Sequence, residues 1–172
     1  MRMLYVLRHA KSSWDDPTLA DHERPLAPRG TRAAPLIGDH LRRVGIAPQV
    51  VLCSSSRRTR QTLDMLGDVV AHDGEVSIED DLYHATAATL LRRLRVVPDA
   101  ASDVLMIGHN PALQQLVLML AASGGSRAQV ARKFPTAALA TLRAAVDRWA
   151  DLDVGRARLT GFVRPKDLGT GV

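Results

Sequence analysis

The sequence predicts an α/β protein, a three-layer α/β/α sandwich in which helices cover both faces of a mostly parallel central sheet. Three observations support this fold class. Short apolar segments alternate along the chain with segments of helical periodicity. The apolar segments lack the polar alternation of half-exposed strands, so both faces of the sheet are expected to be buried. The chain has 172 residues, a length that one hydrophobic core can serve.

Each element is predicted from its own pattern. The expected strands are short apolar segments at residues 3–7, 49–56, 75–78, 103–108, 137–144 and 157–165. The expected helices carry apolar residues at helical spacing and cover residues 28–44, 57–67, 86–97 and 111–121. Two segments rich in serine, aspartate or glycine, 11–27 and 123–126, are predicted to be loops.

We expect a single domain over residues 1–165 and a polar, frayed tail over residues 166–172. The only cysteine is Cys53, which excludes an internal disulfide and favours a reducing compartment. No apolar run is long enough to span a bilayer, and the first one is too short for a signal peptide. These observations predict a cytoplasmic protein without a membrane partner.

Ionisable and polar side chains follow three of the predicted strands at the point where each strand ends. Arg8 and His9 follow the first strand, Arg57 and Arg58 follow the serines that end the second, and His109 and Asn110 follow the strand at 103–108. Ligands of open α/β sheets bind outside the carboxyl ends of the strands. We therefore expect these side chains to meet at one rim of the sheet.

Two histidines and at least two arginines at one rim suit phosphoryl transfer. Arginine binds phosphate oxygens and spreads the developing charge, and a neutral imidazole can attack phosphorus to form a covalent intermediate. A second imidazole, if protonated, would add a donor, and a helix start at residues 56–58 would add backbone N–H groups. The arginines supply the charge that a metal would otherwise bring, so we expect no metal or other cofactor. Taken singly, each residue also fits a structural role, such as a buried histidine or a solvated helix face.

The charge balance leaves one other class of function open. The net charge is +5 and the isoelectric point is about 10.1, values that permit a phosphate-sensing or nucleic-acid-binding module without turnover. Only 3% of the residues are aromatic, so few side chains could stack on bases, and no nucleic-acid-binding motif is present. Nucleic acid is therefore not an expected partner.

Three short motifs carry a family resemblance. "LRHA" at 7–10, "SSSRRTRQT" at 54–62 and "GHNP" at 108–111 resemble the three signatures of the histidine phosphatase superfamily. Within it, "RHAKSSWDDPTLADHERPLAPRG" and "KFPTAALATL" are similar to the small SixA-type phosphohistidine phosphatases. The similarity runs from about residue 3 to residue 163 and implies a phosphoglycerate mutase-like fold.

The resemblance also implies roles for the matched residues. His9 would be the nucleophile that becomes phosphorylated, and Arg8, Arg58 and His109 would be catalytic residues that bind the phosphate. Asn110 would help to form the phosphate-binding loop. Arg58 stands four residues before a threonine, as in the family's second signature, so the preceding arginine is expected to be a solvent-facing neighbour.

One feature of many relatives is missing. The mutase-like branch has a glutamate two residues after a leucine in the middle segment, and here that position is His84. A general acid is typically worth about 10²–10⁴-fold in rate, so its absence disfavours esters, whose leaving alkoxide needs a proton. An imidazole leaving group can take its proton from solvent. His84, Asp80, Asp81 and Asp16 remain weak candidates for an acid.

The sequence therefore predicts a metal-independent phosphatase, a hydrolase that works through a phosphohistidine intermediate. Its expected substrate is a phosphohistidine-containing protein, for example a histidine-phosphotransfer domain. The alternative is a phosphatase of small phosphomonoesters with the same site. A non-catalytic phosphate- or nucleic-acid-binding module is the third possibility.

Overall fold

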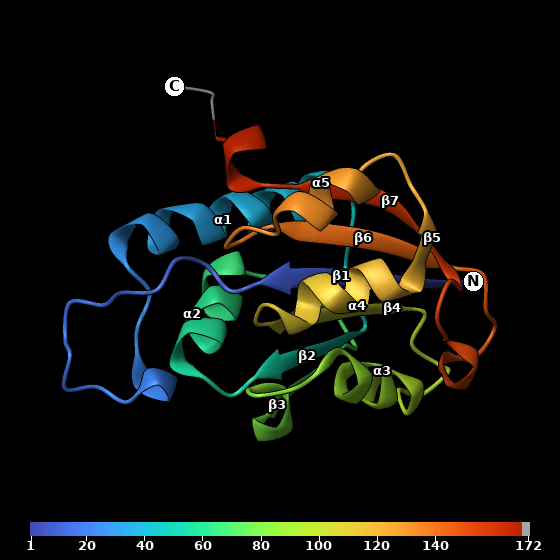
Figure 1. Cartoon of the computed structure of the whole chain (residues 1–172), viewed down its shortest axis with the longest axis horizontal. Coiled ribbons are helices and arrows are strands. Elements are labelled where there is room, and N and C mark those ends of the chain that lie inside the picture. Colours follow the sequence, from blue (N-terminus) through green and yellow to red (C-terminus); the bar gives the residue numbers. More distant parts are fainter. Residues whose placement is uncertain (170–172) are drawn as a thin grey trace.

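The computed structural model describes residues 1–169 and contains a seven-stranded sheet with the strand order β3-β2-β4-β1-β6-β7-β5 (Figure 1). The strands are β1 (Arg2–Arg8), β2 (Val50–Ser54), β3 (Glu75–Glu79), β4 (Asp103–Gly108), β5 (Ala121–Ser123), β6 (Leu139–Ala144) and β7 (Ala157–Val163). Strands β3, β2, β4 and β1 pair in parallel, as β5 does with β7, whereas β6 runs antiparallel to both of its neighbours. The predicted mostly parallel sheet is confirmed.

Helices cover both faces of this sheet, as predicted. The helices are α1 (Pro28–Arg43), α2 (Arg57–Leu66), α3 (Ala87–Arg95), α4 (Ala112–Leu120) and α5 (Arg127–Arg132). In β1, Leu4 and Val6 join the core beneath α3, α4 and α5, and Tyr5 and Leu7 join the core beneath α1 and α2. Burial on both faces explains why the apolar strands show no polar alternation. Within residues 1–169, no helix has the length and apolar character that crossing a membrane requires.

The structure differs from the prediction near residue 125 and at the carboxyl end. The segment after residue 120 contains β5 and α5, which are three and six residues long and too short to produce a periodic pattern. The expectation of a frayed tail is wrong as far as residue 169, because Pro165–Asp167 forms a 3-10 turn and Leu168 packs against the α1–α2 core. Residues 170–172 of the predicted tail lie outside the described residues.

The predicted strand at 137–144 begins two residues later, at Leu139. Ala137 has φ of 60°, a left-handed conformation that cannot continue a strand. Its N–H instead points at the end of β1 and lies within hydrogen-bonding distance of the carbonyls of Arg8 (3.1 Å) and His9 (3.0 Å). The loop before β6 is thereby fixed to the end of the central strand.

The register of the central strands aligns their carboxyl ends. Arg8 lies opposite Gly108 in the β1–β4 pair, and the N–H of His9 donates to the Gly108 carbonyl at 3.1 Å. On the other side of β4, Cys53 of β2 lies opposite Ile107. The residues that directly follow these three strands must therefore emerge side by side.

Helices α1 and α2 pack closely where Gly38 faces the end of α2. A Cβ atom at position 38 would lie 2.0 Å from the backbone oxygen of Leu66 and 2.8 Å from its Cα atom. Backbone atoms cannot turn away as a flexible side chain could, so any side chain here would force the two helices apart.

We expect Gly38→Ala to lower the free energy of unfolding by about 2 kcal/mol or more, because overpacking a tight contact typically costs 1–3 kcal/mol. Urea denaturation followed by circular dichroism measures the change. Gly125→Ala is the matched control, since a Cβ atom there meets nothing within 4 Å, and it should change stability by no more than about 0.5 kcal/mol. Equal stabilities of the two variants would contradict the proposed packing constraint.

Candidate active site

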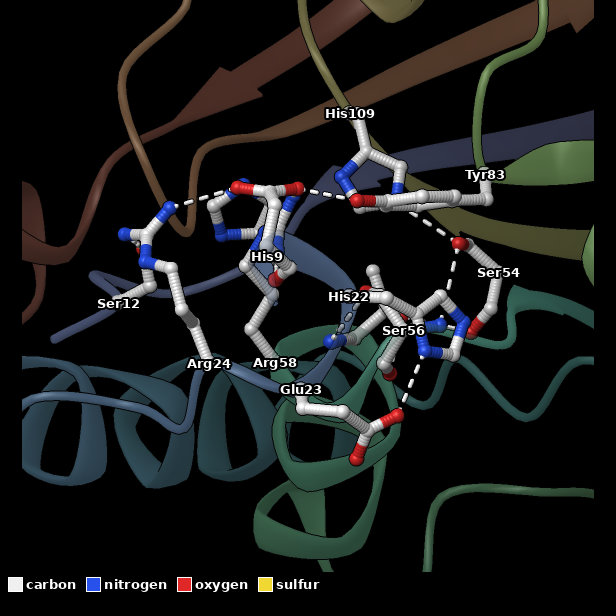
Figure 2. Close-up of polar contacts among 12 residues, drawn as sticks. His9, Ser12, His22, Glu23, Arg24, Ser54, Ser56, Arg58, Tyr83 and His109 are labelled. Carbon is white, nitrogen blue, oxygen red and sulfur yellow. Dashed lines mark hydrogen bonds and ion pairs between the residues drawn. The ribbon is translucent and has the colours of Figure 1, made fainter. Parts of the chain in front are cut away.

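A cavity of about 330 Å³ opens at the carboxyl ends of β1, β4 and β2. Its wall contains four cationic side chains, three histidines and one carboxylate. Five of the residues predicted from the strand ends contribute to it: Arg8, His9, Arg58, His109 and Asn110. Figure 2 shows the polar contacts that join several of them to residues from other elements. The cavity therefore combines the predicted histidines and arginines at one position.

His9 is buried, and its tautomer is set by the backbone. Its Nδ1 atom lies 2.7 Å from the carbonyl oxygen of Ala10, which can only accept, so Nδ1 carries the proton and Nε2 carries the lone pair. Burial lowers the pKa of His9 to about 4, and the neighbouring arginines Arg58, Arg8 and Arg24 lower it further, against the opposing effect of the Ala10 carbonyl. The imidazole is therefore neutral at pH 7, with its nucleophilic nitrogen free of a proton.

His109 lies beside His9, with the two ring centroids 5.3 Å apart, and its Nε2 atom is 2.8 Å from the Ser54 hydroxyl (Figure 2). Burial, followed by the adjacent His9, lowers the pKa of His109 to about 3. The second imidazole is thus neutral at pH 7 and does not supply the positive charge considered for it above. When Nε2 accepts the Ser54 proton, Nδ1 carries the remaining ring proton and can donate a neutral hydrogen bond.

The two predicted arginines are held from different sides. Arg8 donates from Nη1 to the Phe134 carbonyl at 2.9 Å, and its buried Nε has no hydrogen-bond partner among residues 1–169. Arg58 donates from Nη1 to the Asp21 carbonyl at 2.8 Å and from Nη2 to the Asp21 carboxylate at 3.0 Å. A half-buried guanidinium with an unused, buried N–H, beside a second guanidinium, is suited to bind an anion.

The beginning of α2 contributes one side chain to the cavity. Ser56 caps this helix by accepting the Thr59 N–H at 3.4 Å. Arg57 is exposed and reaches the Glu23 carbonyl at 3.5 Å, in agreement with its expected place outside the site. Among the described residues of α2, the cavity wall includes only Arg58, so the structure does not place the helix-start N–H groups there as expected.

Asp21, which the sequence reasoning did not identify, links the arginines. Its carboxylate accepts hydrogen bonds from Tyr83, Arg58 and Arg24, the last at 2.9 Å. The bonds from Tyr83, and then those from the arginines, hold the pKa of Asp21 well below its usual range. Asp21 is therefore a carboxylate that orients two arginines.

Arg24 was also not identified from the sequence. Its guanidinium donates to the Ser12 hydroxyl at 2.6 Å and to the Ser13 carbonyl at 2.9 Å, and it stacks on the exposed ring of Trp14. A bridge between Ser12 and Leu26 closes the segment 11–27 and returns it to the rim. The only available sequence signal was the family-like composition of this segment, which gave no role to a single residue.

The four weak candidates for a general acid lie in different places. Asp16 accepts hydrogen bonds from Thr18 in an exposed loop, and Asp80 and Asp81 begin an exposed 3-10 turn. These three are not part of the cavity wall, whereas His84 is. In the part of the chain that the structure describes, no group of three or more His, Cys, Asp or Glu side chains is arranged to hold a metal ion.

Comparison with known proteins identifies the family. Residues 4–90 match the model of the histidine phosphatase superfamily (branch 1). The uncharacterized protein Rv1276c of Mycobacterium tuberculosis is 42% identical over 164 residues, which covers 93% of this chain and 100% of the relative.

Solved structures agree with this match. A candidate phosphohistidine phosphatase SixA from Nakamurella multipartitia is 33% identical with a TM-score of 0.84, covering 95% of this chain and 96% of the other. Another candidate SixA, from Agrobacterium tumefaciens, is 28% identical with a TM-score of 0.78, covering 95% and 98%. The chain belongs to the histidine phosphatase superfamily and is similar to its SixA-type members, and it is a phosphatase.

The lowered pKa values predict a loss of stability in acid. In the unfolded chain both imidazoles bind protons as the pH falls through about 6.5, whereas in the folded protein they do so only near 4 and 3. Between these limits the unfolded state binds more protons. We therefore expect each histidine to cost about 2 kcal/mol of stability at pH 5 relative to pH 7.5.

Urea denaturation of the wild type and His9→Asn at both pH values tests this expectation. The variant should lose about 2 kcal/mol less than the wild type on acidification. His72→Asn is the control, because the His72 side chain is 99% exposed, and it should show the full loss. The same loss in all three proteins would show that the burial of His9 does not suppress its protonation.

Proposed function

We propose that this member of the histidine phosphatase superfamily is a metal-independent phosphatase that acts on phosphohistidine in a protein, with His9 as its transient phosphoryl acceptor. The observation that carries the proposal is the neutral tautomer of His9. Its Nδ1 proton is held by the Ala10 carbonyl, which leaves the Nε2 lone pair for phosphorus. Arg8, Arg58 and His109 line the same cavity.

In the first step, Nε2 of His9 attacks phosphorus. The new N–P bond forms as the bond between phosphorus and the substrate nitrogen breaks. Arg8 and Arg58 hold the phosphoryl oxygens and neutralise their charge, which is the main requirement of phosphoryl transfer. His109 donates to the same oxygens from Nδ1, with Ser54 holding its Nε2.

In the second step, water hydrolyses the phosphorylated His9. An oxygen–phosphorus bond forms, the bond to Nε2 breaks, and the water's proton passes to the departing phosphate or to solvent. His9 returns to its neutral form with the Nδ1 proton still donated to Ala10. The backbone carbonyl therefore keeps one orientation of the ring through both steps.

The ionised state of the one carboxylate in the described cavity wall supports phosphohistidine as the substrate. Asp21 is ionised because Tyr83, Arg58 and Arg24 all donate to it, so it has no proton to give an alkoxide. A substrate imidazole can leave as a neutral molecule once its other nitrogen carries a proton, and its ordinary pKa of about 6.5 makes that proton available near neutrality. A histidine-phosphotransfer domain is one protein of this chemical kind.

His9→Ala should lower kcat/KM by at least about 10³-fold, both on p-nitrophenyl phosphate and on a phosphohistidine protein, because it removes the attacking atom. Release of inorganic phosphate measures the rate. His72→Ala changes an exposed histidine outside the cavity and should leave both rates unchanged. Retained turnover in His9→Ala would refute the proposed mechanism.

The leaving-group argument predicts a substrate preference in the wild type. At matched concentrations, kcat/KM for a phosphohistidine protein should exceed that for sugar phosphates by at least about 10²-fold, the lower end of what a general acid contributes. The substrates are a protein that has been phosphorylated on histidine with phosphoramidate, and a panel of hexose and glycerol phosphates. A preference for an ester would favour the alternative, a phosphatase of small phosphomonoesters.

A further inference from the structure

A second depression, a groove of about 360 Å³, lies next to the active-site cavity and is strongly basic. Its lining residues come mainly from the start of α1, the end of α5 and the turn after β7. The groove takes six cationic side chains from these elements and from the loop after β1: Lys11, Arg29, Arg132, Lys133, Arg164 and Lys166. Lys11 and Thr136 belong to the walls of both the groove and the cavity. The two sites therefore adjoin.

Most of this charge has no partner within the protein. Arg164 pairs with Asp167 at 3.0 Å, but the other five cations take part in none of the ion pairs formed within residues 1–169. The described wall of the groove contains no aspartate or glutamate. Like charges gathered without counter-charges repel one another and create a field that attracts anions. The groove is thus complementary to an acidic ligand.

We infer that this groove, defined by its six cations, binds an acidic polypeptide segment next to the phosphorylated residue of the protein substrate. The inference rests on the proposed function, because it takes the substrate to be a protein. A segment bound along the groove ends at Lys11, two residues from His9, and so delivers the adjoining residue to the cavity. The groove would select the substrate, whereas the cavity holds only the phosphoryl group.

The form of the groove favours carboxylates on a polypeptide over one more phosphate group. Its cations come from separate chain segments, and all but Arg164 are exposed. In the cavity, by contrast, Arg58 is buried and Arg8 is half-buried, and both donate to backbone carbonyls. A row of dispersed, solvated charges suits an extended acidic partner and fast, steered association.

Nucleic acid is disfavoured by the single aromatic side chain in the groove. Phe162 packs against Phe134 with the ring centroids 5.4 Å apart, and it is only partly exposed. Binding of single-stranded nucleic acid generally needs several aromatic faces on which bases stack. The described groove offers charge without such a platform.

Two peptides test the inference. Both are ten residues long with a central phosphohistidine; one carries four flanking glutamates and the other carries glutamines at the same positions. Wild type is compared with Arg132→Glu/Lys133→Glu and with the control Arg92→Glu/Arg156→Glu. The control changes the net charge equally, but at exposed residues on α3 and in the turn between β6 and β7, outside the groove.

In the wild type at 50 mM NaCl, we expect kcat/KM for the glutamate peptide to exceed that for the glutamine peptide by about tenfold, since several exposed charge pairs each contribute a small factor. The ratio should fall to about one in Arg132→Glu/Lys133→Glu and in the wild type at 0.5 M NaCl, where the Debye length is only a few ångströms. The control variant should keep the ratio. Arg29→Gln/Lys166→Gln gives the same test with a milder change if the first variant does not fold.

A wild-type ratio near one, or equal losses in the groove and control variants, would overturn the inference. A binding measurement tests the groove independently of the proposed function. Fluorescence anisotropy follows the binding of the unphosphorylated peptides. If the glutamate peptide binds but its phosphorylated form is not hydrolysed, the groove stands and the phosphohistidine proposal falls. If a ten-nucleotide single-stranded DNA binds more tightly than the glutamate peptide, and the groove variant loses this binding, the ligand of the groove is nucleic acid and not an acidic segment.

Discussion

The in-register pairing of β1 with β4 is the constraint on which the site depends. Because Arg8 lies opposite Gly108 and the His9 N–H donates to the Gly108 carbonyl, the residues that follow the two strands emerge together. This pairing leaves the two imidazoles 5.3 Å apart. The adjacent β2 brings Ser54 to His109 in the same way, at 2.8 Å. A shift of one residue in the register of the β1–β4 pair would turn His9 to the other face of the sheet and separate it from every partner.

The same arrangement opposes stability. Two imidazoles and two guanidinium groups are removed from water at one point, and groups of one sign lie beside each other. The protein offsets this by keeping both imidazoles neutral and by placing the Asp21 carboxylate between Arg58 and Arg24. Neutrality is also what a nucleophile needs. In the mechanism that we propose, the burial that disfavours protonated His9 therefore also contributes to its reactivity, as is common where function requires perturbed groups.

The sequence was informative where a property is local and less so where it depends on distant contacts. Strand ends could be predicted. Because ligands of open α/β sheets bind at the carboxyl ends of the strands, Arg8, His9 and His109 could then be expected at one rim. Asp21 could not be found, since its role comes from contacts with Arg58, 37 residues away, and with Tyr83, 62 residues away. The same holds for the α2 start, whose N–H groups were expected at the phosphate. Helix propensity placed that start correctly, but its orientation toward the cavity depends on packing.

The contacts in the cavity also limit what the cavity can distinguish. In the mechanism that we propose, Arg8, Arg58 and the His109 N–H bind phosphoryl oxygens, which are the same in every phosphorylated substrate. Two features remain that can separate one substrate from another. The first is the leaving group, because an ionised Asp21 cannot protonate an alkoxide but an imidazole can leave without its help. The second lies outside the cavity, where Lys11 joins it to the basic groove. In the function that we propose, chemistry at the phosphorus and recognition of the surrounding polypeptide are divided between two adjoining surfaces that share Lys11 and Thr136.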